Sequence, residues 1–268
     1  MHHFGVLVPS TNTIVEIEYG RLLPPTLQVH VARIPLLSRG SSDADVDYQS
    51  RLLGTAKVEV VALAQTGATL SDDDYDEQIT KRMTEAAGVP AITSARAIGL
   101  AVRALGAHRI ALVSPFPIPV LERAKRHYTN KYGLEVVALE SFSGTDSIMY
   151  PTVGPDQAYD AITRTDRPEI EVFVVPAGNL PTMSFIGIWE SLVAKPVIST
   201  NQTALWAMLQ IMRVDEKLPK PGTIIGREAR NVRPRVAGLP GLAGHGRPSA
   251  PCSASPDQMS LVACDNTG

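Results

Sequence analysis

Eight short apolar runs, rich in valine and isoleucine and with few polar residues inside them, constrain this chain more than any other feature. Strands that are buried on both faces have such continuous apolar sequences, whereas strands with one face in water alternate polar and apolar residues. The pattern therefore predicts parallel sheets covered by helices. The predicted strands are Phe4–Pro9, Leu27–Ile34, Val58–Ala64, Val89–Thr93, Arg109–Ser114, Leu134–Leu139, Glu171–Pro176 and Pro196–Ser199.

Amphipathic segments separate these runs, and such alternation of strand and helix predicts the α/β class. Glycine follows two of the segments, at Gly106 and Gly133, as is common after a helix. The predicted helices are 12–23, Asp72–Ala87, 95–105, 117–132, 156–165, 182–194 and 202–213.

A faint internal repeat predicts two similar halves. Gly5–Ser10 resembles Ile110–Pro115, and Val60–Gly67 resembles Val172–Asn179. The alternative, that any two buried strands look alike, stays open. We assign residues 1–94 plus 200–226 to the first half and 95–199 to the second. Residues 227–268 show no period of 2 or 3.6 among their apolar residues, so we expect a disordered tail there.

The composition argues against several classes of protein. The net charge is −2, which gives no electrostatic reason to expect nucleic acid or an anionic membrane as a partner. No apolar run approaches the roughly 20 residues of a membrane helix, and we expect a cytoplasmic protein. The two cysteines, Cys252 and Cys264, both lie near the end of the chain. The histidines are dispersed, so we expect no metal. No predicted strand is followed by Gly-x-Gly-x-x-Gly or by a phosphate-binding Gly-Lys-Ser/Thr loop, and we expect no cofactor.

Small polar residues follow most of the predicted strands. Parallel α/β sheets bind ligands at the carboxyl ends of their strands, and backbone N–H groups at helix starts favour anions. Helix capping is the alternative for any one of these residues, whereas six such loops together favour a carboxylate pocket. The expected binding residues are Ser10, Asn12, Thr66, Gly67, Thr93, Phe116, Ala177, Gly178, Asn179 and Asn201.

Four stretches resemble a known family. They are Val8–Thr13 with Glu16 and Glu18, Pro90–Ala95 with Ala104–Leu112, Asn179-Leu180 with Thr182, and Lys195–Trp206. Residues 4–226 resemble the maleate cis–trans isomerase and arylmalonate decarboxylase group of the aspartate/glutamate racemase superfamily. The resemblance implies two Rossmann-like halves about a pseudo-twofold axis, a site between them, and a homo-oligomer.

The resemblance breaks at the residues that would carry the chemistry. Members use one or two cysteines, one from each half, without metal or organic cofactor. The matching positions here are Gln65, or a residue next to it, and Ala177. A tyrosine of the family is Phe116, and an asparagine expected after Asp146 is Ser147. Thiol chemistry is therefore not supported, although the carboxylate-binding loops match.

Other residues must replace the thiols if the chain is an enzyme. The expected catalytic residues are Gln65, Tyr150 and Asp146, the last as a base if burial raises its pKa. Glu18 is a further candidate that could face either the site or solvent. For Tyr150, Asp146 and Glu18 the alternative is an exposed or locally satisfied polar side chain.

Three functions remain open at this stage. The favoured one is a cofactor-independent lyase or isomerase that acts on a small carboxylic or dicarboxylic acid by non-cysteine chemistry. The second is a non-catalytic protein that binds carboxylates. The third is an enzyme for an apolar terpenoid or aryl acid, an idea motivated by Phe116 and by Met149 and Met183.

Overall fold

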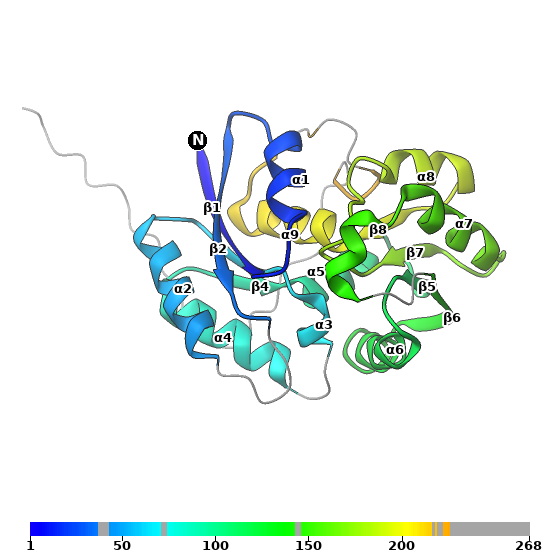
Figure 1. Cartoon of the computed structure of the whole chain (residues 1–268), viewed down its shortest axis with the longest axis horizontal. Helices are drawn as coiled ribbons and strands as arrows, with labels where there is room; N and C mark the ends of the chain where they lie inside the picture. Colours follow the sequence, from blue (N-terminus) through cyan, green and yellow to red (C-terminus); the bar gives the residue numbers. More distant parts are fainter. Residues whose placement is uncertain (37–42, 71–73, 143–145, 216–217, 219–221, 226–268) are drawn as a thin grey trace, which may run out of the picture. The chain divides into compact units, whose positions relative to one another are not determined.

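The computed structural model describes residues 1–36, 43–70, 74–142, 146–215, 218 and 222–225. Strands and helices alternate along it (Figure 1). The strands are β1 His2–Pro9, β2 Leu27–Ile34, β3 Val61–Leu63, β4 Ala91–Thr93, β5 Arg109–Ser114, β6 Glu135–Ser141, β7 Val172–Val175 and β8 Val197–Ser199. The α-helices are α1 Val15–Leu22, α2 Ala44–Thr55, α3 Thr66–Thr69, α4 Tyr75–Ala87, α5 Ser94–Ala104, α6 Ile118–Tyr132, α7 Pro155–Thr165, α8 Ile186–Val193 and α9 Thr200–Met212, and a 3₁₀-helix, η1, spans Ser147–Thr152.

The strands form two parallel sheets of four with the same internal order, β2-β1-β3-β4 and β6-β5-β7-β8. This equivalence confirms the predicted α/β class with two Rossmann-like halves. All eight predicted runs contain a strand, and β2 and β5 have the predicted bounds. The predicted division at residues 94 and 199 stays a prediction, and the predicted tail 227–268 lies outside the described residues.

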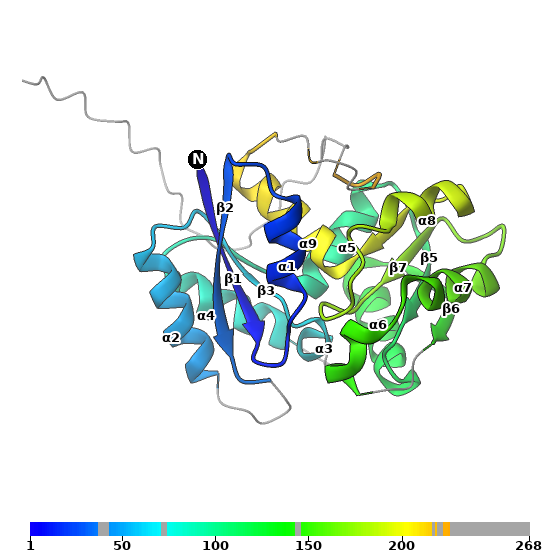
Figure 2. The ribbon, with the colours of Figure 1, turned by 45° about the horizontal axis from the view of Figure 1, so that its top comes forward.

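Each sheet is buried on both faces, which explains the continuous apolar runs. In β5, Ile110 and Leu112 join a central core, whereas Ala111 and Val113 join a separate core under α7 and α8. Strand β1 divides its side chains in the same way, with Leu7 facing α2 and α4. Those two helices lie side by side against the first sheet (Figure 2).

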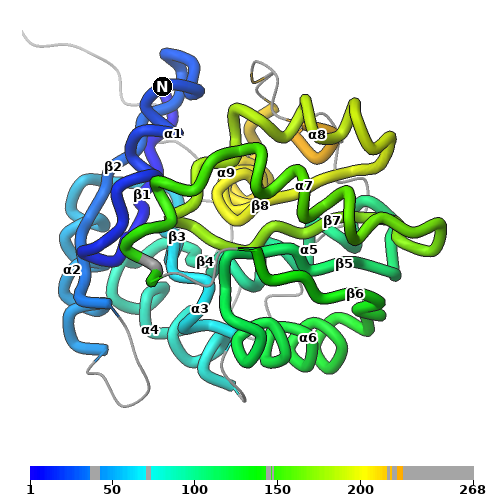
Figure 3. Tube along the Cα trace, turned by 45° about the vertical axis from the view of Figure 1, so that its right-hand side comes forward, coloured from blue at the N-terminus to red at the C-terminus, as the bar shows by residue number. Residues whose placement is uncertain are grey.

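The central core is shared by the two sheets. Helices α5 and α9 follow the corresponding edge strands β4 and β8, and they pack against each other (Figure 3). Trp206 of α9 and Ile98 of α5 are both buried there, together with Val6 of β1 and Val174 of β7. The two sheets therefore pack on one shared apolar core through α5 and α9.

The sequence did not predict α2, α3 or η1. The buried face of α2 consists of Val46, Ser50 and Leu53, so only two apolar residues mark it. This helix approaches α4 through Gly54, where an added Cβ would lie 2.3 Å from the carbonyl oxygen of Ala87. Helix α3 is one turn long, too short for a periodic signal.

Two glycines in helices give a matched test of this packing. A Cβ added at Gly99 of α5 would lie 2.6 Å from the ring of Tyr132, whereas one at the exposed Gly20 of α1 would meet nothing within 4 Å. We expect Gly99→Ala to lower the free energy of unfolding by about 1–3 kcal/mol through overpacking. Gly20→Ala should raise it by up to about 1 kcal/mol through helix propensity. Urea unfolding measures both changes, and equal effects would contradict the packing of α5 on α6.

Candidate functional site

The turn that follows β7 bonds to loops at the ends of other strands. The carbonyl oxygen of Gly178 accepts hydrogen bonds from Asn12 Nδ2 and from Asn201 Nδ2, each at 3.1 Å. Asn12 follows β1 of the first sheet, and Asn201 lies in the first turn of α9. A Cβ built on Gly178 would lie 3.4 Å from the carbonyl oxygen of Ala64, which follows β3. Strand ends of both sheets therefore converge at Gly178.

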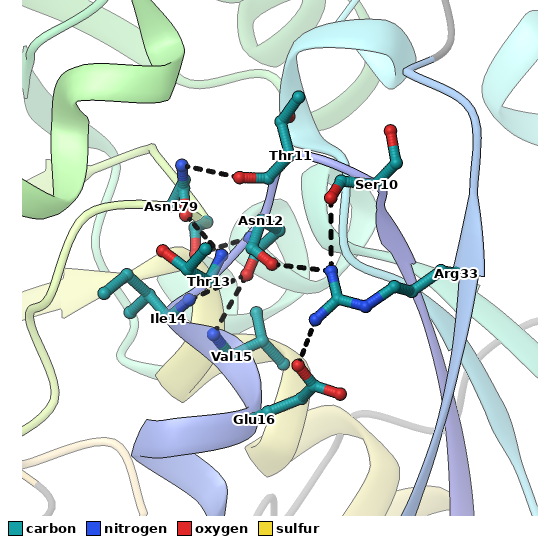
Figure 4. Close-up of polar contacts among 10 residues, drawn as sticks. Ser10, Thr11, Asn12, Thr13, Ile14, Val15, Glu16, Arg33 and Asn179 are labelled. Carbon is teal, nitrogen blue, oxygen red and sulfur yellow. Dashed lines mark hydrogen bonds and ion pairs between the residues drawn. The ribbon is translucent and has the colours of Figure 1, made fainter.

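Asparagines also organise the loop between β1 and α1 (Figure 4). Asn12 Oδ1 accepts from the N–H groups of Ile14 at 3.0 Å and Val15 at 3.1 Å, and so caps α1. Asn179 Oδ1 accepts from the N–H of Thr13 at 2.9 Å, and Asn179 Nδ2 donates to the carbonyl of Thr11 at 3.4 Å. The turn after β7 is thus held to this loop by side chains from both sides.

Arg33, in β2, is a residue of this region that the sequence did not single out. Its Nη1 donates to the carbonyls of Ser10 at 3.3 Å and Asn12 at 2.9 Å, and its Nη2 pairs with Glu16 (Figure 4). Ser10 itself is exposed. The strand-end pattern that predicts the binding residues applies to residues after strands, so an arginine inside a strand carries no such signal.

Glu18 of α1 is buried and bonded to the second half, which answers the question left open by the sequence. Its Oε1 accepts from the N–H groups of Thr182 at 2.6 Å and Met183 at 2.8 Å. Its Oε2 accepts from Asn201 Nδ2 at 2.6 Å. Burial raises the pKa of Glu18, and these three hydrogen bonds oppose that rise.

The predicted threonines lie in different surroundings. Thr66 Oγ1 lies 3.1 Å from Thr200 Oγ1, so the turns after β3 and β8 meet there. The following Gly67 has open space, since an added Cβ would meet no atom within 4 Å. Thr93 instead donates to Asp76 and accepts from the N–H of Arg96 at 3.2 Å, which is a capping arrangement at the start of α5.

The two positions that the resemblance matches to the family's thiols, one at or next to Gln65 and one at Ala177, are both buried. Gln65 is the residue before α3, and Ala177 joins the core under α7 and α8. Ala64 and Gly178, which adjoin these positions in the sequence, approach each other, since a Cβ built on Gly178 would lie 3.4 Å from the carbonyl oxygen of Ala64. The turns that carry the two positions therefore meet, as two halves about a pseudo-twofold axis require.

Tyr150 and Asp146 differ in burial. Tyr150 is 3% exposed, and its ring centre lies 6.1 Å from that of Phe116. Burial, with a smaller effect of Asp146, raises the pKa of Tyr150 to about 12, so this phenol keeps its proton at neutral pH. Asp146 is exposed and accepts from the N–H of Ile148 at 3.5 Å. The burial that was the condition for its role as a base is therefore absent, and the role itself stays a prediction.

Two negative findings apply to the described residues. They contain no group of three or more His, Cys, Asp or Glu side chains that could hold a metal ion. None of their helices is long and apolar enough to cross a membrane.

Two sheets of equal strand order, joined by hydrogen bonds between their strand-end loops, define a two-halved α/β protein of the aspartate/glutamate racemase type. The sequence pattern of the arylmalonate decarboxylase family matches residues 42–225. The chain therefore belongs to the arylmalonate decarboxylase family.

Individual relatives agree with this assignment. The maleate isomerase of Pseudomonas putida KT2440 is 26% identical over 247 residues, which cover 84% of this chain and 97% of that protein. A crystal structure of a cysteine-to-alanine variant of the maleate isomerase Iso from Pseudomonas putida S16 with maleate has 26% identity and a TM-score of 0.77, over 84% of this chain and 97% of that one.

A more distant structure supports the fold. The maleate cis–trans isomerase of Nocardia farcinica, with a covalently bound succinylcysteine intermediate, has 21% identity and a TM-score of 0.75, over 84% of this chain and 98% of that one. The predicted class, an isomerase or lyase of the maleate isomerase and arylmalonate decarboxylase type, is confirmed by these comparisons.

The raised pKa of Glu18 predicts a pH-dependent contribution to stability. A carboxyl with a higher pKa in the folded state binds more protons folded than unfolded, so its stabilisation is present below the unfolded value of 4.5 and is lost as pH rises through the folded pKa. We expect the free energy of unfolding of the wild type, minus that of Glu18→Gln, to be larger at pH 4 than at pH 8. Urea unfolding at both pH values measures it, and a difference that grows with pH would contradict the cause assigned here.

Proposed function

We propose that the chain is a cofactor-independent lyase or isomerase that acts on a small carboxylic or dicarboxylic acid without a thiol. The observation that carries the proposal is the close approach of Gly178 to Ala64, beside Gln65 and Ala177: a Cβ built on Gly178 would lie 3.4 Å from the carbonyl oxygen of Ala64. These two positions match the family's cysteines, while the only cysteines of the sequence are Cys252 and Cys264. In this proposal the chain has the fold of the family, and residues other than cysteine carry the chemistry.

In the proposed reaction, neutral donors stabilise negative charge. Loss of CO₂ breaks a C–C bond of the acid and leaves an electron pair that spreads onto the remaining carboxylate as an enediolate, which then takes a proton from water to give the product. Isomerisation through loss of a proton beside the carboxyl leaves the same electron pair, and we propose Asp146 as the base that takes this proton and returns it. Donors fixed in a buried site favour such a charge. Gln65 offers an amide donor, and Tyr150, with its pKa near 12, offers a phenol that stays protonated. Neither serves as a base at neutral pH.

The proposed binding residues fall into two groups, according to whether their hydrogen-bond donors already bond to oxygen atoms of the protein. The amides of Asn12, Asn179 and Asn201 donate to protein oxygens, so we assign them to positioning the loops. The hydroxyl of Thr93 is used in the same way. For the substrate carboxylate we retain Ser10, Thr66, Gly67 and the backbone of Gly178, with Phe116 and Ala177 as apolar neighbours.

An apolar or aryl acid is the second candidate substrate. Phe116 and Tyr150 pack ring to ring, and η1 leaves Ile148 57% and Met149 47% exposed. Apolar side chains next to this ring pair favour a substrate with a hydrocarbon part. We also propose, from the family resemblance alone, a homo-oligomer, and from the sequence a cytoplasmic location.

Proton NMR in D₂O tests the proposal. The purified chain is incubated with maleate, fumarate, malate, substituted malonates, aspartate, glutamate and aryl acids. We expect one class of acid to change, with the same rate in the presence of EDTA or iodoacetamide. Gln65→Ala and Tyr150→Phe should each lower that rate about 100-fold, the usual cost of losing one donor to a developing oxyanion. Asp146→Asn tests the predicted base in the same assay.

Two controls separate the alternatives. Asn130→Ala, at an exposed position of α6, should leave the rate unchanged. Loss of turnover in EDTA would contradict a cofactor-independent reaction. An acid that raises the melting temperature of the protein but gives no product would favour the non-catalytic binding protein instead.

A further inference from the structure

The side-chain amide of Asn201 has a fixed direction. The residue is 1% exposed, and its Nδ2 donates to Glu18 Oε2 at 2.6 Å and to the carbonyl of Gly178 at 3.1 Å. A carboxylate and a carbonyl can only accept, so the nitrogen must face both of them. The oxygen of the amide therefore has to point the other way.

That oxygen, Asn201 Oδ1, is a buried acceptor that no donor of the described residues reaches. It lies 3.4 Å from the position that a Cβ on Gly178 would occupy, and the carbonyl oxygen of Ala64 lies 3.4 Å from the same position. Two acceptors thus flank one side of Gly178. A buried acceptor without a donor is uncommon and calls for a partner from outside the chain.

We propose that Asn201 Oδ1 accepts a hydrogen bond from a hydroxyl or amino group of the substrate, and that Glu18 is the positioning residue that presents this oxygen. The inference rests on the proposed function and narrows it, since the acid then carries a donor besides its carboxylate. A carboxylate alone does not fit at this point, because its oxygens would face two acceptors.

Glu18 controls the direction of the amide because its Oε2 accepts from Asn201 Nδ2. In Glu18→Gln, the new amide keeps an oxygen for the N–H groups of Thr182 and Met183, and its nitrogen then faces Asn201 Nδ2. Two donors that face each other are unfavourable, and a turned Asn201 amide would place Oδ1 against the carbonyl oxygen of Gly178. Neither orientation keeps both contacts, so we expect Asn201 Oδ1 to lose its fixed position.

Pairs of acids that differ by one hydroxyl test the inference without any turnover. Malate is compared with succinate, and hydroxymalonate with malonate, by titrating the ¹⁵N-labelled full chain and following its amide signals by NMR. We expect the hydroxy acid of at least one pair to bind tenfold or more tightly than its partner, since sites built to bond a hydroxyl reject analogues that lack it. Glu18→Gln should abolish that preference.

Glu190→Gln is the matched control. Glu190 also accepts backbone N–H bonds from two segments, from Val197 at 3.1 Å and Thr223 at 2.9 Å, and none of its bonds reaches Asn201. This variant should keep the preference even if it is less stable. A general loss of structure would lower affinity for both acids of a pair and leave their ratio unchanged.

The outcomes separate the inference from the proposed function. Equal binding of both acids in the wild type, or a preference that survives Glu18→Gln, overturns the inference and leaves an acid-binding site in place. No binding of any of these acids overturns both. The wild-type comparison decides the matter if Glu18→Gln does not fold.

Discussion

The carbonyl oxygen of Gly178 is the point on which the arrangement of the site depends. It takes one hydrogen bond from Asn12 and one from Asn201, residues 166 and 23 positions away in the sequence. These bonds join the loop after β1, the turn after β7 and the start of α9. Apolar packing of α5 on α9 holds the halves together but leaves the direction of the loops open, because such packing is non-directional.

The buried carboxylate of Glu18 extends this network. Burial disfavours its charged form, and three donors, two from the second half and one from Asn201, reduce that cost without cancelling it. A single nitrogen, Asn201 Nδ2, donates to both the Glu18 carboxylate and the Gly178 carbonyl. The consequence for function is that several polar side chains near the strand ends already have protein partners. Fewer groups are left to recognise a ligand than the sequence suggests.

The sequence predicted the framework because burial on both faces of a sheet leaves a strong local pattern. Strands β2 and β5 were predicted with their bounds, and the start of α6 after Pro117 was predicted to within one residue. Helix α2 was missed because its buried face includes Ser50 and relies on the glycine contact with α4. That contact joins residues 54 and 87, and no local periodicity records it.

The candidate site was less predictable, since its chemistry depends on partners distant in the sequence. Asn12, Asn179 and Asn201 were recognised as polar residues at strand ends, but the acceptors that their nitrogens would meet could not be known. The burial of Glu18 and the exposure of Asp146 depend on how the second half packs against the first. The sequence did not mark Arg33 as a site residue, because it lies inside a strand, between the apolar residues Ala32 and Ile34.

The central claim is that two side-chain amides converge on one carbonyl. NMR couplings across hydrogen bonds test it directly, in a protein labelled with ¹⁵N at asparagine and ¹³C at the glycine carbonyl carbon. We predict couplings from the side-chain nitrogens of both Asn12 and Asn201 to the carbonyl carbon of Gly178, with slow exchange of both amides with water. Rapid exchange of the two amides and no coupling from either would contradict the account.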